Sequence, residues 1–191
     1  MKVVAVNGSA RREGNTAMLL DVVLGELEKE DIDTEVVSLA GSDIRGCTAC
    51  YRCYDHRDRR CVIDDVVNEC IAMMLEADGV ILASPTYFAN VSPELKALID
   101  RAGMVARAND HMFQGKVGAA VVAVRRAGAL PVFDAINHFF LISQMIVPGS
   151  SYWNLGVGRT PGDVADDAEG METMRTLGAN MAWLLHRLHG R

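Results

Sequence analysis

Four short runs rich in valine, isoleucine and alanine alternate with longer amphipathic segments, and this alternation limits the possible folds of the chain more than any other feature. The runs are Val3–Val6, Glu35–Leu39, Val80–Ala83 and Val117–Val124. The segments between them place apolar residues at spacings of three and four, which predicts helices. Such an alternation is typical of a parallel sheet that is covered by helices on both faces.

The helical periodicity predicts helices at about 19–27, 66–75, 92–102, 131–143 and 171–188. A fifth strand is expected at Met145–Tyr152. Together these elements make five β/α units, so the expected fold class is α/β: a doubly wound three-layer sandwich around a five-stranded parallel sheet. We expect one domain over residues 1–191, with a cysteine-rich loop at 46–62.

Composition excludes several classes of protein. The net charge of -6 and the pI near 5.3 argue against a general nucleic-acid binder. The longest apolar runs, such as Val117–Val124, are far shorter than the roughly 20 residues that cross a bilayer, so no membrane span is expected. The N-terminus lacks the pattern of a signal peptide, and a cytoplasmic location is expected. The five cysteines are an odd number, which favours metal or redox chemistry over a disulfide framework.

The segment Asn7–Thr16, between the first strand and the first helix, has the chemistry of a phosphate-binding loop. It includes Gly14, and unpaired backbone N–H groups at the start of a helix attract an anion. Side-chain donors are available on Ser9, Arg11, Asn15 and Thr16. Neither a Gly-Lys-Ser/Thr ending nor a Gly-x-Gly-x-x-Gly pattern is present, so a monophosphate without Mg²⁺ is favoured. The alternative is a tight turn that merely caps the helix.

Two further loops follow the third and fourth strands and should flank this phosphate site, because ligands of open α/β sheets lie beyond the carboxyl ends of the strands. In Ser84–Asn90, Tyr87 and Phe88 offer aromatic surface for a flat ring, although packing in the core is an alternative for both. The side chains of Thr86 and Asn90 can bond the polar edge of such a ring. The full predicted lining of this part of the pocket is Pro85, Thr86, Tyr87, Phe88, Asn90, Arg125, Arg126 and Gly128.

Three motifs of this chain resemble the NADPH-dependent FMN reductase family of flavodoxin-like proteins. They are Gly8-Ser9-Ala10-Arg11 with Gly14-Asn15-Thr16, then Ser84-Pro85-Thr86-Tyr87-Phe88-Ala89-Asn90-Val91-Ser92, and Leu95-Lys96-x-Leu98-Ile99-Asp100-Arg101. The resemblance implies strand order 2-1-3-4-5, FMN as cofactor, and a homodimer or tetramer with the flavin near a subunit interface. It also implies that the first loop binds the phosphate and that the two later loops surround the isoalloxazine ring. NAD(P)H as electron donor follows from the name of the family alone.

The cysteines Cys47, Cys50, Cys53 and Cys61 have the spacing Cys-x2-Cys-x2-Cys-x7-Cys, which can wrap thiolates around one iron-sulfur cluster. Zinc and uncoordinated thiols remain alternatives. The compact spacing resembles the iron-sulfur flavoproteins, a branch of the same family, and implies a [4Fe-4S] cluster. Cys70 lies on the apolar stripe of a helix and is predicted to be a packing residue.

The function expected from these features is that of an FMN-dependent oxidoreductase that passes electrons between FMN and a [4Fe-4S] cluster or a redox partner. NAD(P)H or ferredoxin would supply the electrons, and no side chain is expected to act as a catalytic nucleophile, because the cofactor carries the chemistry. Three alternatives stay open: an electron-transfer flavoprotein without small-molecule turnover, a flavin-only reductase that lacks a cluster, and an interaction protein with an empty pocket.

Overall fold

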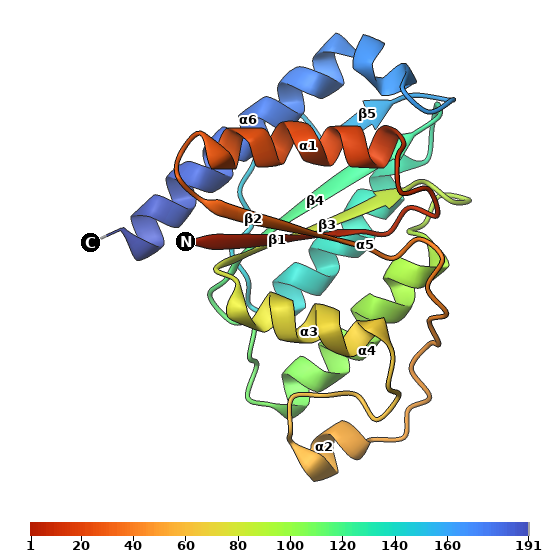
Figure 1. Cartoon of the computed structure of the whole chain (residues 1–191), viewed down its shortest axis with the longest axis vertical. Coiled ribbons are helices and arrows are strands. Elements are labelled where there is room, and N and C mark those ends of the chain that lie inside the picture. The colour runs from red at the N-terminus through yellow and green to blue at the C-terminus, as the bar shows by residue number, and fades with distance from the viewer. Residues whose placement is uncertain (191) are drawn as a thin grey trace.

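Five parallel strands form one sheet in the order β2-β1-β3-β4-β5, as the computed structural model of the chain shows (Figure 1). The structure describes residues 1–190. The strands are β1 (Lys2–Asn7), β2 (Asp33–Ser38), β3 (Gly79–Pro85), β4 (Val117–Val124) and β5 (Leu155–Val157). The predicted fold class and strand order are confirmed. Between β1 and β3 the strand order reverses direction, and a crevice for a ligand is expected beyond the carboxyl ends of these two strands.

Helices cover both faces of this sheet (Figure 1). On one face lie α1 (Asn15–Glu28) and α6 (Ala168–His189), and on the other lie α3 (Val66–Glu76), α4 (Pro93–Ala108) and α5 (Ala129–Ile142). The short α2 (Arg52–His56) contacts α4, and the 3-10 helix η1 (Asp163–Asp166) precedes α6. No helix within residues 1–190 combines the length and the apolar character that crossing a membrane requires.

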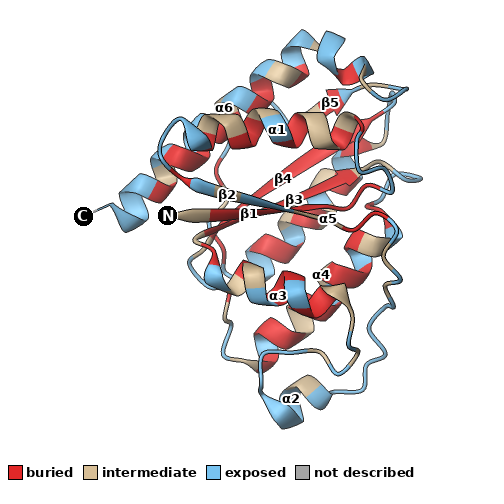
Figure 2. Cartoon of the chain, in the orientation of Figure 1, coloured by how far each residue is buried: buried red, intermediate tan, exposed pale blue. Residues whose placement is uncertain are grey.

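Two separate hydrophobic cores fill the layers, because successive side chains of a strand point to opposite faces of the sheet. Val3 and Ala5 of β1 pack under α1 and α6, whereas Val4 and Val6 pack against α3 and α4. Figure 2 shows the resulting buried centre of the sheet and the exposed outer faces of the helices. Cys70 is fully buried in the second of these cores, as predicted.

The fifth strand lies later in the chain than predicted. Ile146 makes only an isolated parallel bridge to Val117, and the chain then leaves the sheet until β5 pairs with Val122–Val124. Pro148 lies in this excursion, and a proline cannot donate a ladder hydrogen bond. Asn154 brings the chain back, because its amide nitrogen donates to the Ala120 carbonyl at 3.0 Å and its own carbonyl accepts from the Val122 N–H, also at 3.0 Å.

Helix α4 begins at Pro93, close to the predicted start at about 92. The Ser92 hydroxyl accepts from the Leu95 N–H at 3.3 Å, Pro93 occupies the first turn, and Glu94 adds a negative charge there. A Cβ on Gly8 would lie 2.8 Å from the Leu95 Cβ and 3.0 Å from the Ser92 hydroxyl. The first loop therefore packs directly on the start of α4, and only glycine allows this close approach.

Candidate flavin and cysteine sites

The loop between β1 and α1 is held in part by its own side chains. The Ser9 N–H donates to the Asn7 side-chain oxygen at 3.0 Å, and the Arg11 N–H donates to the Ser9 hydroxyl at 3.1 Å. The Gly8 N–H donates to the Ala83 carbonyl of β3 at 2.8 Å, which fixes the loop to the neighbouring strand. The Ser9 hydroxyl thus supports the turn as well as facing the pocket.

The start of α1 keeps free donors for an anion. Gly14 occupies the cap position, where it has no side chain to satisfy the first N–H groups of the helix. Among residues 1–190, no acceptor lies within hydrogen-bond reach of the backbone N–H groups of Asn15, Thr16 and Ala17, and none bonds the hydroxyl of the buried Thr16. These groups and the helix dipole point at one place, which is the arrangement that binds a phosphate group.

A cleft of about 220 Å³ opens in front of these donors at the carboxyl ends of β1, β3 and β4. The residues that line it come from all three predicted loops and from a fourth loop after β5. They are Ser9, Ala10, Arg11, Gly14, Asn15, Thr16, Pro85, Thr86, Tyr87, Ala123, Val124, Arg125, Gly158 and Arg159. The three arginines make the cleft electropositive, as a dianionic phosphate requires.

Four predicted lining residues do not line this cleft: Phe88, Asn90, Arg126 and Gly128. Tyr87 and Asn90 exchange two backbone hydrogen bonds of 2.9 and 3.0 Å, which closes a tight hairpin with positive φ at Phe88 and Ala89. Phe88 is fully exposed at its tip, so the core-packing interpretation is wrong for this residue. Gly128, at a φ of 88°, lies directly beneath Ala89 and supports the hairpin.

Asn15 connects the first loop to a loop that sequence reasoning missed. Its side-chain oxygen accepts from the Gly162 N–H at 3.0 Å and from the Val164 N–H at 3.3 Å. A Cβ on Gly158 would lie 2.6 Å from the Asn15 amide nitrogen, so this loop passes very close to α1. The sequence signal for this wall of the cleft is the pair Gly158-Arg159, a glycine and a cation that directly follow the last strand. Asn15 thus holds that wall through its side-chain oxygen, which leaves its side-chain nitrogen and its backbone N–H for a ligand.

The four predicted cysteine ligands lie together on the side of α4 that faces α2. Cys47, Cys50, Cys53 and Cys61 all line one small cavity, together with Arg101. All four are free thiols; the first two are exposed and the last two are partly buried. In the part of the chain that the structure describes, no three His, Cys, Asp or Glu side chains converge closely enough to hold a single metal ion.

Arg101 is a buried cation at the centre of this region, and sequence reasoning gave it no role. It forms an ion pair with Asp65 at 2.6 Å, and Asp65 also caps α3 by accepting from the Val67 N–H at 3.0 Å. The Nε of Arg101 donates to the Cys61 sulfur at 3.3 Å. Burial alone would lower the pKa of Arg101, but the hydrogen bonds with Asp65 and Cys61 offset it and raise this pKa above its usual value.

The environments of the thiols differ. The Arg52 N–H, followed by the Thr48 hydroxyl, lowers the pKa of Cys50, whereas burial raises the pKa of Cys53. In the core, burial raises the pKa of Cys70 to about 12. Cys50 therefore has the most accessible thiolate of these three, and Cys70 is a neutral packing residue.

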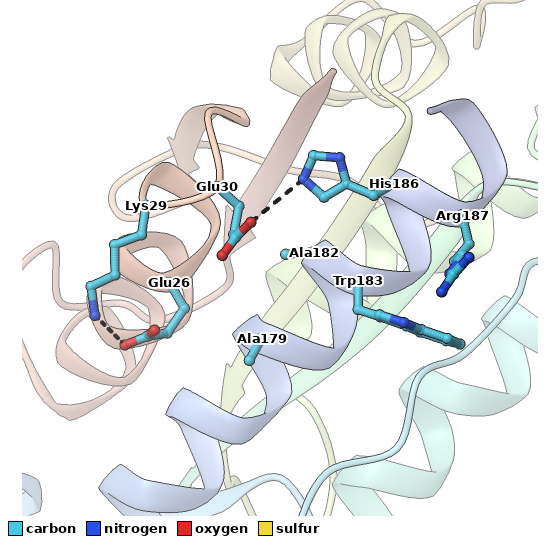
Figure 3. Close-up of a pocket in the computed structure, with 8 residues that line it drawn as sticks. All are labelled: Glu26, Lys29, Glu30, Ala179, Ala182, Trp183, His186 and Arg187. Atoms are coloured by element: carbon cyan, nitrogen blue, oxygen red, sulfur yellow. Dashed lines mark hydrogen bonds and ion pairs between the residues drawn. The ribbon is translucent and has the colours of Figure 1, made fainter. Parts of the chain in front are cut away.

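A separate hollow of about 410 Å³ lies between α1 and α6, at the end of α1 that is remote from the cleft (Figure 3). Figure 3 shows Glu30 facing His186 at 3.8 Å and Arg187 beside the ring of Trp183, 5.7 Å from its centroid. Glu26 pairs with Lys29 at 2.6 Å. The charged groups that line this hollow largely pair with one another. The free donors at the carboxyl ends of the strands are therefore the better candidate for a cofactor site.

Two relatives match this chain over most of its length. An iron-sulfur flavoprotein of Methanocaldococcus jannaschii is 41% identical over 189 residues, which cover 95% of this chain and 96% of that protein. An iron-sulfur flavoprotein of Methanosarcina thermophila is 32% identical over 176 residues, which cover 91% of this chain and 90% of that protein.

Solved structures show the same fold. A structure of RosB with a bound intermediate, 8-demethyl-8-formylriboflavin-5'-phosphate, aligns with a TM-score of 0.73 at 21% identity, over 98% of this chain and 80% of that chain. A flavodoxin from the domain Archaea aligns with a TM-score of 0.62 at 18% identity, over 97% of this chain and 99% of that chain. A sequence profile described as NADPH-dependent FMN reductase matches residues 1–160. This chain, whose sheet has the strand order 2-1-3-4-5, belongs to the NADPH-dependent FMN reductase family.

Proposed function

We propose that this chain is an FMN-dependent oxidoreductase whose cleft at the carboxyl ends of β1, β3 and β4 binds the cofactor. The observation that carries the proposal is the set of free donors at the start of α1: the backbone N–H groups of Asn15, Thr16 and Ala17 and the buried Thr16 hydroxyl. The phosphate of FMN fits this set because it is a compact dianion that needs several converging donors. Membership of the family supports FMN over other phosphate esters.

The chain's own residues would bind and orient the flavin. Arg11 comes from the loop that carries the proposed phosphate donors, whereas Tyr87 and Arg125 line the cleft from the loops after β3 and β4. The Thr86 hydroxyl and the Thr86 N–H both donate to the Ala123 carbonyl, at 3.1 and 2.8 Å, so Thr86 fixes the hairpin against β4 and neither donor is free for the ring. Bound FMN supplies the two-electron chemistry, and the protein sets the orientation of the ring and its access to water.

Titration of apoprotein with FMN, followed by quenching of flavin fluorescence, tests this assignment. We expect one FMN per chain, bound more tightly than riboflavin, which lacks the phosphate. Equal affinities for FMN and riboflavin would contradict the phosphate site at α1.

We further propose that Cys47, Cys50, Cys53 and Cys61 hold a [4Fe-4S] cluster. The four thiols line one cavity, and thiolates that each bind a different iron need not converge on one point, which is compatible with the lack of a single-ion site within residues 1–190. The names of the relatives in Methanocaldococcus jannaschii and Methanosarcina thermophila support this donor set. Such a group supplies one-electron transfer.

Iron and sulfide analysis of anaerobically purified protein tests the cluster. Cys50→Ser should lose most of the iron and sulfide, whereas the matched variant Cys70→Ala should keep both, because Cys70 lies in the apolar core. Wild-type protein without iron and sulfide, or equal losses in both variants, would contradict the cluster.

We propose NAD(P)H as the electron donor, on the support of the family alone, with reduced ferredoxin as the alternative. Anaerobic bleaching of the bound flavin separates them, since NADPH or NADH should reduce the flavin without any added protein. Bleaching only by reduced ferredoxin would contradict NAD(P)H as the donor and identify ferredoxin in its place.

We also propose that the chain self-associates as a dimer or tetramer. Leu141 and Ile142, at the end of α5, are 62% and 60% exposed, which is unusual for adjacent aliphatic side chains on a lone subunit. Sedimentation equilibrium tests this proposal. A monomer at micromolar concentration would contradict it.

A further inference from the structure

The guanidinium group of Arg101 forms three hydrogen bonds in addition to its ion pair with Asp65. Its side chain is 0% exposed, and the ion pair with Asp65 at 2.6 Å already compensates the buried charge. It also donates to the Arg45 carbonyl at 3.2 Å and to the Ile63 carbonyl at 2.7 Å. One further N–H, on Nε, donates to the Cys61 sulfur at 3.3 Å. Arg101 therefore ties both ends of the cysteine-rich loop to α4.

Cys61 is held at its backbone as well as at its sulfur. Its N–H donates to the side-chain oxygen of Asn68 on α3 at 2.8 Å, and its carbonyl accepts from the Asn68 amide nitrogen at 3.0 Å. Asn68 is itself buried. Cys47 and Cys50, on the same cavity, are exposed. One of the four thiols is thus fixed from two helices, whereas two others lie at the surface.

We propose that Arg101 is a positioning residue of the cysteine cavity, which holds the Cys61 sulfur in place for cluster assembly and raises the reduction potential of the bound cluster through its N–H···S hydrogen bond. The inference rests on the proposed [4Fe-4S] site. It assigns a role to the last residue of the Leu95–Arg101 motif, which the flavin cleft does not use.

The direction of the effect on the potential follows from charge. Reduction adds one electron to the cluster, and a hydrogen bond from a cationic donor to a ligand sulfur stabilises the more negative state. Residues that orient a ligand in this way commonly change metal affinity when they are removed. Loss of the bond should therefore lower the reduction potential and weaken retention of the cluster.

Two variants separate positioning from simple folding. Arg101→Gln removes the charge and most of the donors. Arg101→Lys keeps a cation that can pair with Asp65, but a single ammonium group cannot reproduce the planar fork that reaches Cys61 and the two carbonyls. Arg175→Gln, at an exposed ion pair with Glu172 on α6, is the matched control for the same change of side chain.

The first measurement is the reduction potential of the cluster in the holoproteins, from redox titration monitored by electron paramagnetic resonance. For both Arg101 variants we expect the ratio of reduced to oxidised cluster at a fixed potential to fall about tenfold, equivalent to about 59 mV for one electron. The Arg175 variant should match the wild type. Wild-type potentials in both Arg101 variants would overturn the proposed effect on the cluster.

The second measurement does not need the cluster. Apoprotein is treated anaerobically with iodoacetamide, and the labelling rate of each cysteine is followed by peptide mass spectrometry. In the wild type Cys61 should react more slowly than Cys50, and Arg101→Gln should raise the rate at Cys61 several-fold relative to Cys50. An unchanged rate at Cys61 would overturn the positioning role. Labelling of the buried Cys70 reports global unfolding, and in that case Arg101→Lys takes the place of the glutamine variant.

The two measurements also distinguish this inference from the proposed function. A wild-type protein that binds no iron and sulfide would contradict the cluster and with it the shift in potential. The labelling comparison in the apoprotein would still decide whether Arg101 positions Cys61.

Discussion

The side-chain oxygen of Asn15 lies 3.0 Å from the backbone nitrogen of Gly162, so the first residue of α1 holds the loop that follows the last strand of the sheet. The same oxygen accepts from the Val164 N–H at 3.3 Å. This loop contributes Gly158 and Arg159 to the cleft. The residue that begins α1, the helix proposed to bind the phosphate, therefore also positions the opposite wall of the cleft.

Asn15→Ala should weaken both the fold and the binding of FMN. The substitution leaves two partly buried N–H groups without an acceptor, and the free energy of unfolding should fall by about 1–2 kcal/mol. Urea denaturation of the apoprotein measures this loss, and FMN titration measures the affinity. Asn180→Ala removes one exposed hydrogen bond, to the Gly149 carbonyl, and should change neither value appreciably. Equal effects of both variants would contradict the role of Asn15.

Thr16→Val should separate cofactor binding from stability. The Thr16 hydroxyl has no partner among residues 1–190, so its replacement by a methyl group of similar size should leave the unfolding of the apoprotein nearly unchanged. A hydrogen bond to a charged group contributes about 1.5–3 kcal/mol, which corresponds to a loss of FMN affinity of about ten- to hundredfold. Riboflavin, which has no phosphate, is the control ligand. A similar loss for both flavins would show that Thr16 does not contact the phosphate.

Gly8→Ala should destabilise the protein by about 1–3 kcal/mol, because the added Cβ would lie 2.8 Å from the Leu95 Cβ and 3.0 Å from the Ala83 carbonyl oxygen. Gly25→Ala is the matched control within α1. Its Cβ meets no atom within 4 Å, and alanine favours a helix over glycine by about 0.5–1 kcal/mol, so this variant should be more stable than the wild type. Thermal unfolding measures the change in stability of both variants, which should be negative for Gly8→Ala and positive for Gly25→Ala. Stabilisation by Gly8→Ala would contradict the packing of the first loop on α4.

Cys70 should make stability depend on pH in the alkaline range. Its pKa is raised from 9.0 in the unfolded reference to about 12 in the fold, because burial penalises the thiolate. Its contribution is therefore fully present below pH 9 and is lost progressively as the pH rises toward about 12. At one pH unit above the unfolded pKa the loss is about 1.4 kcal/mol.

The measurement for Cys70 is the difference in the free energy of unfolding between wild type and Cys70→Ala at several pH values. This difference removes the contributions of lysines, tyrosines and the other thiols, which titrate in both proteins. The wild type should lose stability faster than the variant above pH 9. Parallel pH profiles would show that Cys70 does not titrate with unfolding.

The sequence predicted those parts of the fold that depend on local pattern. β1, β3 and β4 are buried runs with clear ends, the cap at Ser92 is a local hydrogen bond, and the glycine-rich loop after β1 was correctly placed at the cleft. The resemblance added the strand order and the family, and both are confirmed. Binding of FMN and of a cluster by the named residues remains a prediction.

The fifth strand was misplaced because its sequence carries two weak strand signals. Met145–Tyr152 is apolar enough for a strand, yet in this segment only Ile146 forms a bridge with the sheet, and the paired residues of the fifth strand are Leu155–Val157. An edge strand pairs with only one other strand and is less buried than a central strand, so an apolar run does not show where it lies. The side chain of Asn154, which bonds the Ala120 carbonyl at 3.0 Å, decides where the chain returns.

The roles of Arg101 and Asn15 depend on contacts between distant parts of the chain, which spacing does not show. Arg101 contacts Cys61, 40 residues earlier, and Asn15 contacts Gly162, 147 residues later. An arginine on a predicted amphipathic helix is usually solvated, so periodicity alone gives no reason to place it beneath a loop. Core packing was the alternative for Phe88, and it is wrong because a tight hairpin with positive φ leaves this residue fully exposed.

Helix α4 spans the distance between the two places where we propose electron carriers. Its first turn packs on Gly8, directly before the residues of the first loop that line the cleft, and Arg101, nine residues after Ser92, contacts Cys61. At 1.5 Å per residue these points are about 14 Å apart along a single rigid element. A rotation or shift of this one helix would therefore displace residues at both places together.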